Sequence, residues 1–257
     1  MKKLTYLKIF LVVIFLGGVI TSGAVFSLVY KYYKELPDIS TLIEDYSPSI
    51  PTTVYDRKGR VIDVISREKR ETAKFREIPQ NLKNAFLAIE DKQFYSHHGI
   101  HYKRLLGAVV ANVKSGAAVQ GASSFTQQLA RNAFLSHEKS IARKIKEALI
   151  TFEIERKYTK DEIFEKYLNE IYFGAGAYGV KTAAEQFYKK DISQINLAEA
   201  ALLAGIPNRP ETYNPSKKLN NSLKRMRLIL SEMCKDGMIT KDEYDKAIAH
   251  KFYNEDN

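Results

Sequence analysis

The stretch EDKQFYSHHG, Glu90 to Gly99, carries carboxylates, aromatic rings and histidines close together. These side chains could in principle bind a metal ion, but the stretch lacks the recurrent spacings of zinc sites. Successive residues on a helix diverge by about 100°, so Glu90 and Asp91 are a poor chelating pair. Glu90 follows an apolar helix face, and a carboxylate there is suited to general acid or base catalysis. A solvated helix end is the competing interpretation.

A second stretch, GASSFTQQLARN from Gly121 to Asn132, leads from small residues into hydroxyls and carboxamides. Such a junction between a loop and a helix offers backbone N–H groups and side-chain donors to an anion or a sugar. The alternative is a helix start that is capped by Ser123 or Ser124, and the two interpretations are compatible.

A third stretch, SHEKSIARKIKEALITFEIERK, has helical periodicity. Apolar side chains such as Ile141 share one face, while Lys139, Arg143 and Lys146 line the other face and Glu147 flanks them. A basic stripe of this kind suits a pyrophosphate, through charge-assisted hydrogen bonds. The alternative is an ordinary solvated face.

Together these stretches resemble the signatures of the peptidoglycan glycosyltransferases of family 51. The first matches the pattern Glu-Asp-x-x-Phe-x-x-His-x-Gly, and the second is similar to Gly-Gly-Ser-Thr-x-Thr-Gln-Gln followed by a basic residue and Asn. RKIKE resembles the third signature, KDEIFEKYLNEIYFG the fourth and AAEQFYKKDISQINLAEAALLAGIPNRPETYNP the fifth. The second signature departs from the pattern at Ala122, Ser124 and Arg131, which puts fine details of binding in doubt.

The resemblance implies a mainly α, lysozyme-like glycosyltransferase domain with a small membrane-facing lobe. It implies the polymerisation of lipid II, an undecaprenyl-pyrophosphoryl disaccharide-pentapeptide, into glycan strands with inversion and release of undecaprenyl pyrophosphate. Glu90 would be the general base, and Glu147 would act with basic residues on the pyrophosphate side. The expected substrate-binding residues are Asp91, Phe94, His97, Gly99, Ser123, Thr126, Gln127, Gln128, Arg131, Lys139, Arg143, Lys144 and Lys146.

The same resemblance leaves a divalent cation, Mg²⁺ or Mn²⁺, open as a cofactor, with unknown ligands, and implies no organic cofactor. It makes the stretch from Leu105 to Val119 the part that contacts lipid. The expected partners are lipid II, the growing glycan strand, the cytoplasmic membrane and other proteins of cell-wall synthesis. Moenomycin is the inhibitor expected from the family.

The elements that must position these residues begin with an uncharged, mostly apolar run from Ile9 to Tyr30. It is long enough to cross a bilayer as a helix, which needs roughly 20 residues. Lys2, Lys3 and Lys8 favour a cytoplasmic N-terminus, which places the remainder of this single-pass protein on the outer side. A cleaved signal peptide is the alternative. The net charge of +10 indicates an anionic partner, and the outer location excludes nucleic acid.

The chain of 257 residues divides into an anchor (1–34), a linker with a small β element (35–78) and the glycosyltransferase domain (79–257). A hairpin is expected around Arg57, Lys58 and Gly59. Helices are expected over 140–157, 160–172, 197–204 and 222–236. Cys234 is the only cysteine, which excludes an intrachain disulfide.

Three alternatives remain open at this point. The chain is a monofunctional enzyme or the N-terminal part of a class A penicillin-binding protein, since no complete transpeptidase motif set is present. A lysozyme-like enzyme that cleaves glycan is the nearest functional rival. A non-catalytic, membrane-tethered scaffold that binds cell-wall polymer is a rival of another class.

Overall fold

The computed structural model describes residues 2–44, 46, 52–65, 69–115, 123–136, 138 and 140–252, and most of them are helical. The helices are α1 (Lys2–Glu35), α2 (Ile39–Glu44), α3 (Gln80–Glu90), α4 (Tyr102–Ser115), α5 (Phe125–Phe134), α6 (Ile141–Lys157), α7 (Lys160–Glu170), α8 (Val180–Tyr188), α9 (Leu197–Gly205), α10 (Pro215–Lys235) and α11 (Lys241–Ile248). The 3₁₀ turns are η1 (Phe75–Glu77), η2 (Phe94–Ser96) and η3 (Ile192–Gln194). The strands are β1 (Thr52–Tyr55), β2 (Val61–Ile65), β3 (Lys69–Arg70), β4 (Tyr172–Gly174) and β5 (Ala177–Tyr178).

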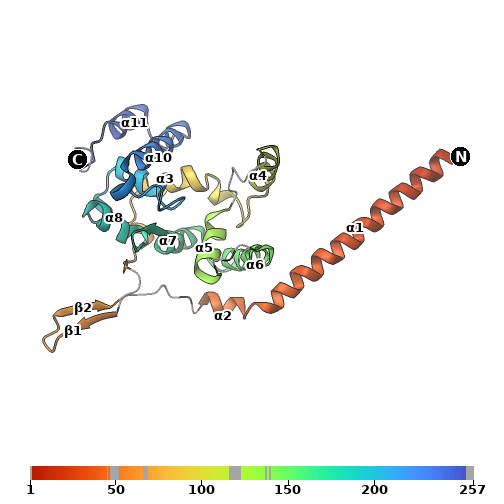
Figure 1. Cartoon of the computed structure of the whole chain (residues 1–257), viewed down its shortest axis with the longest axis horizontal. Helices are drawn as coiled ribbons and strands as arrows, with labels where there is room; N and C mark the ends of the chain where they lie inside the picture. The colour runs from red at the N-terminus through yellow and green to blue at the C-terminus, as the bar shows by residue number, and fades with distance from the viewer. Residues whose placement is uncertain are drawn as a thin grey trace.

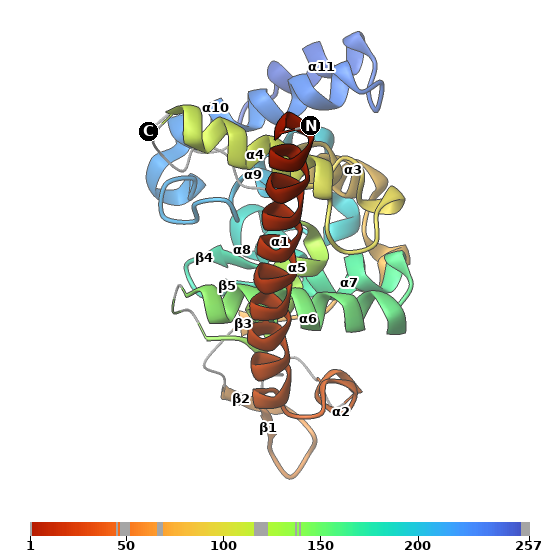
Figure 2. The same cartoon turned by 90° about the vertical axis from the view of Figure 1, so that its right-hand side faces the viewer.

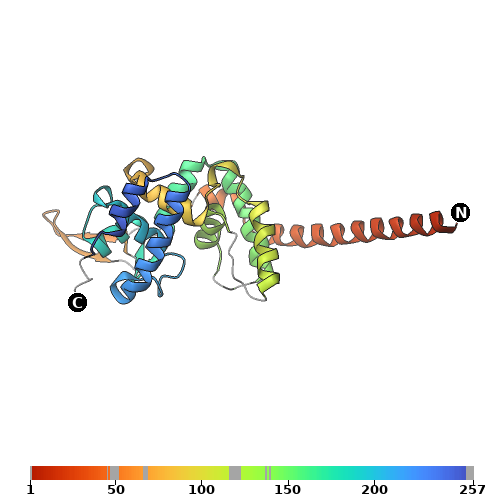
Figure 3. The ribbon, with the colours of Figure 1, turned by 90° about the horizontal axis from the view of Figure 1, so that it is seen from above.

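Helix α1 extends away from the rest of the molecule (Figures 1 and 3). Within the described part of the chain, one segment is long and apolar enough to cross a membrane, Ile14–Glu35, with a mean hydropathy of 1.5 and none of its window buried. Figure 1 places α4, α5 and α6 on the side from which α1 projects, and α8, α10 and α11 on the other. Figure 2 looks onto the first side, where α4 lies above α6.

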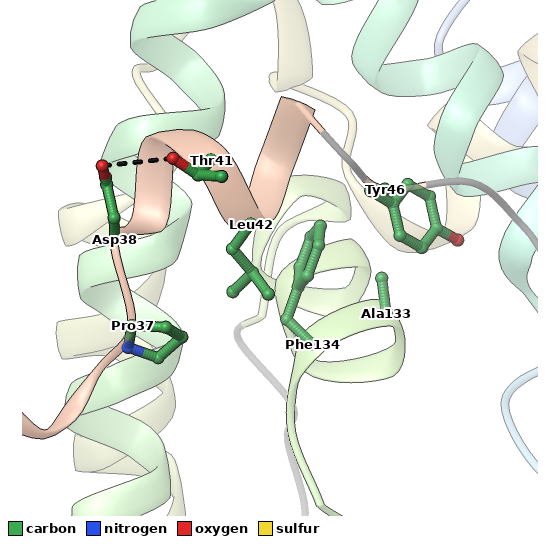
Figure 4. Close-up of a pocket in the computed structure, with 7 residues that line it drawn as sticks. All are labelled: Pro37, Asp38, Thr41, Leu42, Tyr46, Ala133 and Phe134. Carbon is green, nitrogen blue, oxygen red and sulfur yellow. Dashed lines mark hydrogen bonds between the residues drawn. The ribbon is translucent and has the colours of Figure 1, made fainter.

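The link between α1 and the domain is a docked helix. Ile39 and Ile43 of α2 are buried, and the Tyr158 hydroxyl at the end of α6 donates to the Ile43 carbonyl oxygen at 3.2 Å. A hollow of about 480 Å³ remains between α2 and the end of α5, where the Tyr46 ring lies edge-on to Phe134 (Figure 4). The junction between α1 and the domain is therefore packed.

The core forms around α9, whose residues Ala198 to Gly205 are all buried between α3 and α10. Small alanine side chains allow close approach of the neighbouring helices. A second part of the core is aromatic, where the Phe125 ring of α5 lies 4.8 Å from Phe164 and 4.5 Å from Tyr167, both on α7. These two clusters fix α3, α5 and α7 relative to one another.

The strands form two small sheets. β1 and β2 are antiparallel, and their turn places Gly59 at φ 76° while Asp56 accepts the N–H groups of Lys58 and Arg60. The hairpin predicted there is confirmed. In the second sheet β3 pairs in parallel with β5, and β5 pairs antiparallel with β4. β3 thereby joins the predicted linker to the main domain.

The mainly helical fold, the short β element and the long apolar N-terminal helix are confirmed. The predicted helix over 160–172 ends two residues early at Glu170, because Tyr172 enters β4. The last long helix begins at Pro215, before the predicted 222, and contains a kink at Lys218. The domain boundaries at 34 and 78 stay predictions.

Gly99 generates the first testable prediction, because it has φ +80° and a Cβ there would lie 2.6 Å from the Thr151 Cγ2 on α6. Left-handed backbone costs an L-residue about 1–2 kcal/mol, and forced overpacking costs about 1–3 kcal/mol more. We expect Gly99→Ala to lower the free energy of unfolding by at least about 2 kcal/mol in chemical denaturation.

Gly237 is the matched control, because its φ is +69° but a Cβ there would have nothing within 4 Å. Gly237→Ala should cost about 1 kcal/mol, for backbone strain alone. Adding Thr151→Ser to Gly99→Ala should recover part of the loss, since serine keeps the hydroxyl that donates to the Glu147 carbonyl oxygen and removes the clashing methyl. Equal losses at both glycines would contradict this account.

An ion-pair network joins the end of α3 to α10, and it generates a prediction about pH. Lys92 Nζ lies 2.7 Å from Glu232 Oε2 and 2.8 Å from Asp236 Oδ2. Hydrogen bonds from Lys235 and Lys92 lower the pKa of the Glu232 carboxyl from its ordinary 4.5 to about 2. Because the folded-state pKa is the lower one, the stability that Glu232 contributes is present above about pH 4.5 and is lost as the pH falls toward 2.

We therefore expect the difference in Tm between the wild type and Glu232→Gln to be steady near neutral pH and to shrink between pH 4.5 and 2. Thermal unfolding across that range measures it. Glu211→Gln is the control, because Glu211 is exposed and its only ion pair among the described residues is a 3.8 Å contact with Lys217. A Glu232→Gln difference that stays constant down to pH 2 would refute the assignment.

Candidate active site

Glu90 is the last residue of α3, where the backbone of Asp91 leaves helical geometry at φ −155° and ψ 76°. The Glu90 side chain is half-buried, and its Oε2 accepts a hydrogen bond from Gln128 Nε2 at 3.1 Å. Arg104 of α4 donates to the Glu90 carbonyl oxygen. A hollow of about 330 Å³ opens beside it, lined by Ala88, Ile89, Glu90, Asp91, Lys92, Gln93, His101 and Arg104. Glu90 is therefore held at the edge of a cavity and remains accessible.

Asp91 is a buried carboxylate with 1% of its surface exposed. His97 Nε2 lies 3.0 Å from its Oδ2, and the Phe125 N–H at the start of α5 lies 3.4 Å from the same oxygen. Arg104 stands 3.9 Å from Oδ1. Asp91 thus connects the end of α3, the loop after it, α4 and α5.

Phe94 and Gly99 support this loop from inside. The Phe94 ring is fully buried and lies 5.1 Å from the Phe125 ring and 5.8 Å from the Phe164 ring. Gly99 packs against Thr151 of α6, and its carbonyl oxygen accepts the Ser124 hydroxyl. Direct contact of Asp91, Phe94 or Gly99 with a substrate stays a prediction, and their burial favours a positioning role.

The first turn of α5 separates the predicted binding residues into two groups. Ser124 is the N-cap, with its Oγ accepting the Gln127 N–H at 3.2 Å while Gln127 Oε1 accepts the Ser124 N–H at 3.1 Å. Of the two caps predicted as alternatives, Ser123 and Ser124, the structure has Ser124. Thr126 is also buried and donates to Glu155 of α6. Gln127 therefore stabilises the turn and Thr126 joins α5 to α6, whereas Gln128 contacts Glu90 and Ser123 contacts Lys144, the partner of Glu147.

Glu147 lies in α6 with 1% of its surface exposed. Its Oε1 accepts a hydrogen bond from Lys144, and Lys144 Nζ also lies 3.2 Å from Ser123 Oγ. Its Oε2 is buried without a partner among the described residues. Because an unpaired buried carboxylate oxygen is unfavourable, this atom is available to a cationic ligand or a donor.

The predicted basic stripe consisted of Lys139, Arg143 and Lys146, and its role stays a prediction. Lys146 Nζ lies 3.0 Å from Glu35 Oε2 of α1 and 5.7 Å from the centre of the Tyr32 ring, whereas Lys144 pairs with Glu147. Lys144 and Lys146 are two positions apart and therefore point about 200° apart around the helix, so Lys146 contacts α1.

The remaining predicted residues have separate positions. Arg143 is half-buried in the first turn of α6, where Ser140 caps its N–H. Arg131 is half-buried on α5, and its charge acts on the Tyr167 hydroxyl. Lys139 lies outside the described residues, as do Gly121 and Ala122.

Sequence reasoning did not single out Arg104 or Tyr167. Arg104 lies one turn into the helix that follows the first signature, and this spacing from Glu90 was the available signal. Tyr167 lies within the fourth signature, where its aromatic type indicates core packing alone. No group of three or more His, Cys, Asp or Glu side chains suited to a metal ion occurs in the described ranges.

The site thus contains two carboxylates on different helices. Residues at the start of α5 contact one of them directly and the other through a lysine. Gln128 binds Glu90, and Ser123 reaches Glu147 through Lys144. One carboxylate is accessible and fit to accept a proton, while the other is buried beside a cation. This arrangement suits a displacement in which one side takes a proton and the other side faces a charged group.

The chain is similar to known proteins over most of its length. A family model described as Transglycosylase matches residues 58–234. Penicillin-binding protein 1A of Aquifex aeolicus is 44% identical over 216 residues, 84% of this chain and 30% of that protein. Penicillin-binding protein 1A/1B of Bacillus subtilis is 42% identical over 238 residues, 92% of this chain and 26% of that protein.

A crystal structure of penicillin-binding protein 1A from Haemophilus influenzae is also similar, with a TM-score of 0.48 and 25% sequence identity over 80% of this chain and 21% of that chain. The chain spans less than a third of the length of these relatives. The family model covers more than half of the chain. The chain therefore belongs to the transglycosylase family.

Proposed function

We propose that this chain is a peptidoglycan glycosyltransferase that polymerises lipid II into glycan strands and releases undecaprenyl pyrophosphate. The observation that carries the proposal is the pair of carboxylates, Glu90 and Glu147, organised from one short segment at the start of α5. The family match and the similarity to penicillin-binding proteins support this reading.

In the proposed reaction Glu90 takes the proton from the 4-hydroxyl of the acceptor sugar. The hydroxyl oxygen forms a bond to the anomeric carbon of the growing chain, the bond from that carbon to the pyrophosphate oxygen breaks, and the configuration inverts. Gln128 holds one oxygen of Glu90, which orients the carboxylate toward its proton. An inverting displacement requires the base and the leaving group on opposite sides of the sugar.

Glu147 and Lys144 form the leaving-group side. Lys144 is the cation closest to Glu147 in the described structure, and its exposed ammonium can also contact a pyrophosphate oxygen. The orphaned Oε2 of Glu147 fits Mg²⁺ or Mn²⁺, because these ions bind through one or two carboxylates together with substrate phosphates. Such an ion would offset the charge of the pyrophosphate between Glu147 and the substrate.

We further propose that α1 anchors the protein in the cytoplasmic membrane with the domain on its outer face. Lys2, Lys3 and Lys8 favour this orientation. Helix α4 supports contact with the membrane, because it lies on the side from which α1 projects (Figure 2) and exposes Leu105, Leu106 and Val110. Such an exposed apolar surface suits a lipid interface. Val119 and its neighbours lie outside the described residues.

The test is incubation of detergent-solubilised protein with labelled lipid II, with and without moenomycin, followed by separation of the products by size. Polymer that moenomycin suppresses would support the proposal. Release of fragments from purified cell wall would instead support a glycan-cleaving enzyme. Folded protein that binds glycan but makes no polymer would support the scaffold.

Glu90→Gln should reduce polymerisation by about 10²-fold or more, because the amide cannot accept the proton. The amide keeps the size of the side chain, so the Tm should stay close to that of the wild type. The matched control is Glu153→Gln, a carboxylate on α6 that bonds to Ser40 and Arg156 and does not line the cavity beside Glu90. Near-normal turnover by Glu90→Gln would exclude Glu90 as the base.

Lys144 and Lys146 provide a matched pair, because they are close in sequence and have different partners. Lys144→Met should lower kcat/KM for lipid II by about tenfold or more, since a charged donor to the pyrophosphate is lost. Lys146→Met should remain within about threefold of the wild type, since this lysine faces α1. Equal losses of kcat/KM in both variants would indicate that Lys146 also binds the pyrophosphate, which would contradict its contact with Glu35 of α1.

A further inference from the structure

Tyr167 of α7 lies wedged between the helices that carry the predicted base and its partner. Its side chain is fully buried. The ring centre lies 4.5 Å from Phe125, the first residue of α5, and 6.1 Å from Phe86, which it meets edge to face. Phe86 precedes Glu90 by about one turn of α3, and Phe125 precedes Gln128 by about one turn of α5. Tyr167 therefore packs against the helical turns that precede Glu90 and Gln128.

The Tyr167 hydroxyl has no hydrogen-bond partner among the described residues. Buried hydroxyl groups are normally paired, and an exception in a native protein marks strain or function. Tyr188 shows the ordinary case, because its part-buried hydroxyl donates to the Glu199 carbonyl oxygen at 3.1 Å. Tyr167 thus keeps a donor in the protein interior that its own surroundings do not use.

Charged side chains of the candidate site act electrostatically on this hydroxyl. Burial raises the pKa of Tyr167 well above its ordinary value, the charges of Glu90 and Asp91 raise it further, and Arg131 opposes the rise. The hydroxyl therefore stays protonated and lies in the field of both carboxylates. Asp91 already accepts from His97 and the Phe125 N–H, and Glu90 Oε2 accepts from Gln128, whereas Glu90 Oε1 receives no hydrogen bond from any described residue. A buried donor without an acceptor and a half-buried carboxylate oxygen without a donor thus lie near each other.

We propose that Tyr167 is a positioning residue whose hydroxyl donates to the second oxygen of Glu90 through one bridging water molecule. With Gln128 on the other oxygen, the carboxylate is fixed in one orientation while it receives the proton of the acceptor sugar. Tyr167 keeps its own proton, so the proton balance of the reaction does not change. This inference rests on the proposed function, in which Glu90 is the base.

The test compares Tyr167→Phe with Tyr188→Phe in full-length protein, by lipid II polymerisation and by thermal unfolding. Tyr167→Phe removes an unpaired hydroxyl, so its Tm should equal that of the wild type or exceed it. Its kcat should fall about tenfold while KM stays within about twofold, because orientation of the base acts on the chemical step. Tyr188→Phe loses a hydrogen bond, so its Tm should fall and its kcat should be normal well below that Tm.

Two results would overturn the inference while the proposed function stands. One is a wild-type kcat for Tyr167→Phe, and the other is a fall in its Tm as large as that of Tyr188→Phe, which would give the hydroxyl a structural role. Wild-type protein that forms no polymer would instead overturn the proposed function, and the role of Tyr167 with it. Polymerisation by the wild type therefore distinguishes a failure of this inference from a failure of the proposed function.

Discussion

The burial of the Asp91 carboxylate is the constraint on which the site depends. A buried charge is tolerated only where it is paired and hydrogen-bonded, so neighbouring segments must converge on it. His97 and the Phe125 N–H supply direct contacts, and Arg104 lies beside them. The position of the Glu90 carboxylate follows from this arrangement, because Glu90 immediately precedes Asp91. Asp91 also holds the first turn of α5, from which Gln128 donates a hydrogen bond to Glu90.

Helix α6 connects the loop after Asp91 to the part of the site that contains Glu147. Gly99, in the loop after Asp91, allows close contact with Thr151, and the Thr151 hydroxyl bonds back to the Glu147 carbonyl oxygen. The neighbouring Lys146 bonds instead to Glu35 at the end of α1. Helix α6 therefore has a carboxylate in the site and, at the preceding position, a cation that contacts α1.

Local signals in the sequence predicted much of the fold. The β1–β2 hairpin, a serine cap before α5 and the helix predicted over 140–157 depend on nearby residues, and all are present, with Ser124 as the cap and the helix starting at Ile141. The small β4–β5 hairpin was missed, because YFGAGAY bends through the positive φ values of Gly174, Ala175 and Gly176 and pairs with a distant strand. Long-range pairing of this kind leaves no periodicity in a single sequence.

The contacts of the predicted site residues could not be predicted from the sequence, and their roles stay predictions. The family resemblance marked Thr126 and Gln127 as substrate-binding residues, and in the structure their side chains bond to Glu155 and to the Ser124 backbone. Which face of a helix meets the cleft depends on distant packing, as Lys146 also illustrates through its contact with Glu35. Tyr167 could not be recognised, because only the structure shows that its buried hydroxyl lacks a partner among the described residues.

The most direct measurement of the organising role of Asp91 is amide hydrogen exchange of Asp91→Asn against the wild type. If one buried charge holds the site together, residues 97–101 and the first turn of α5 should lose protection together, while α9 and α10 keep theirs. Loss of protection in only one of these two segments, or in neither, would show that each is held independently and would contradict the account.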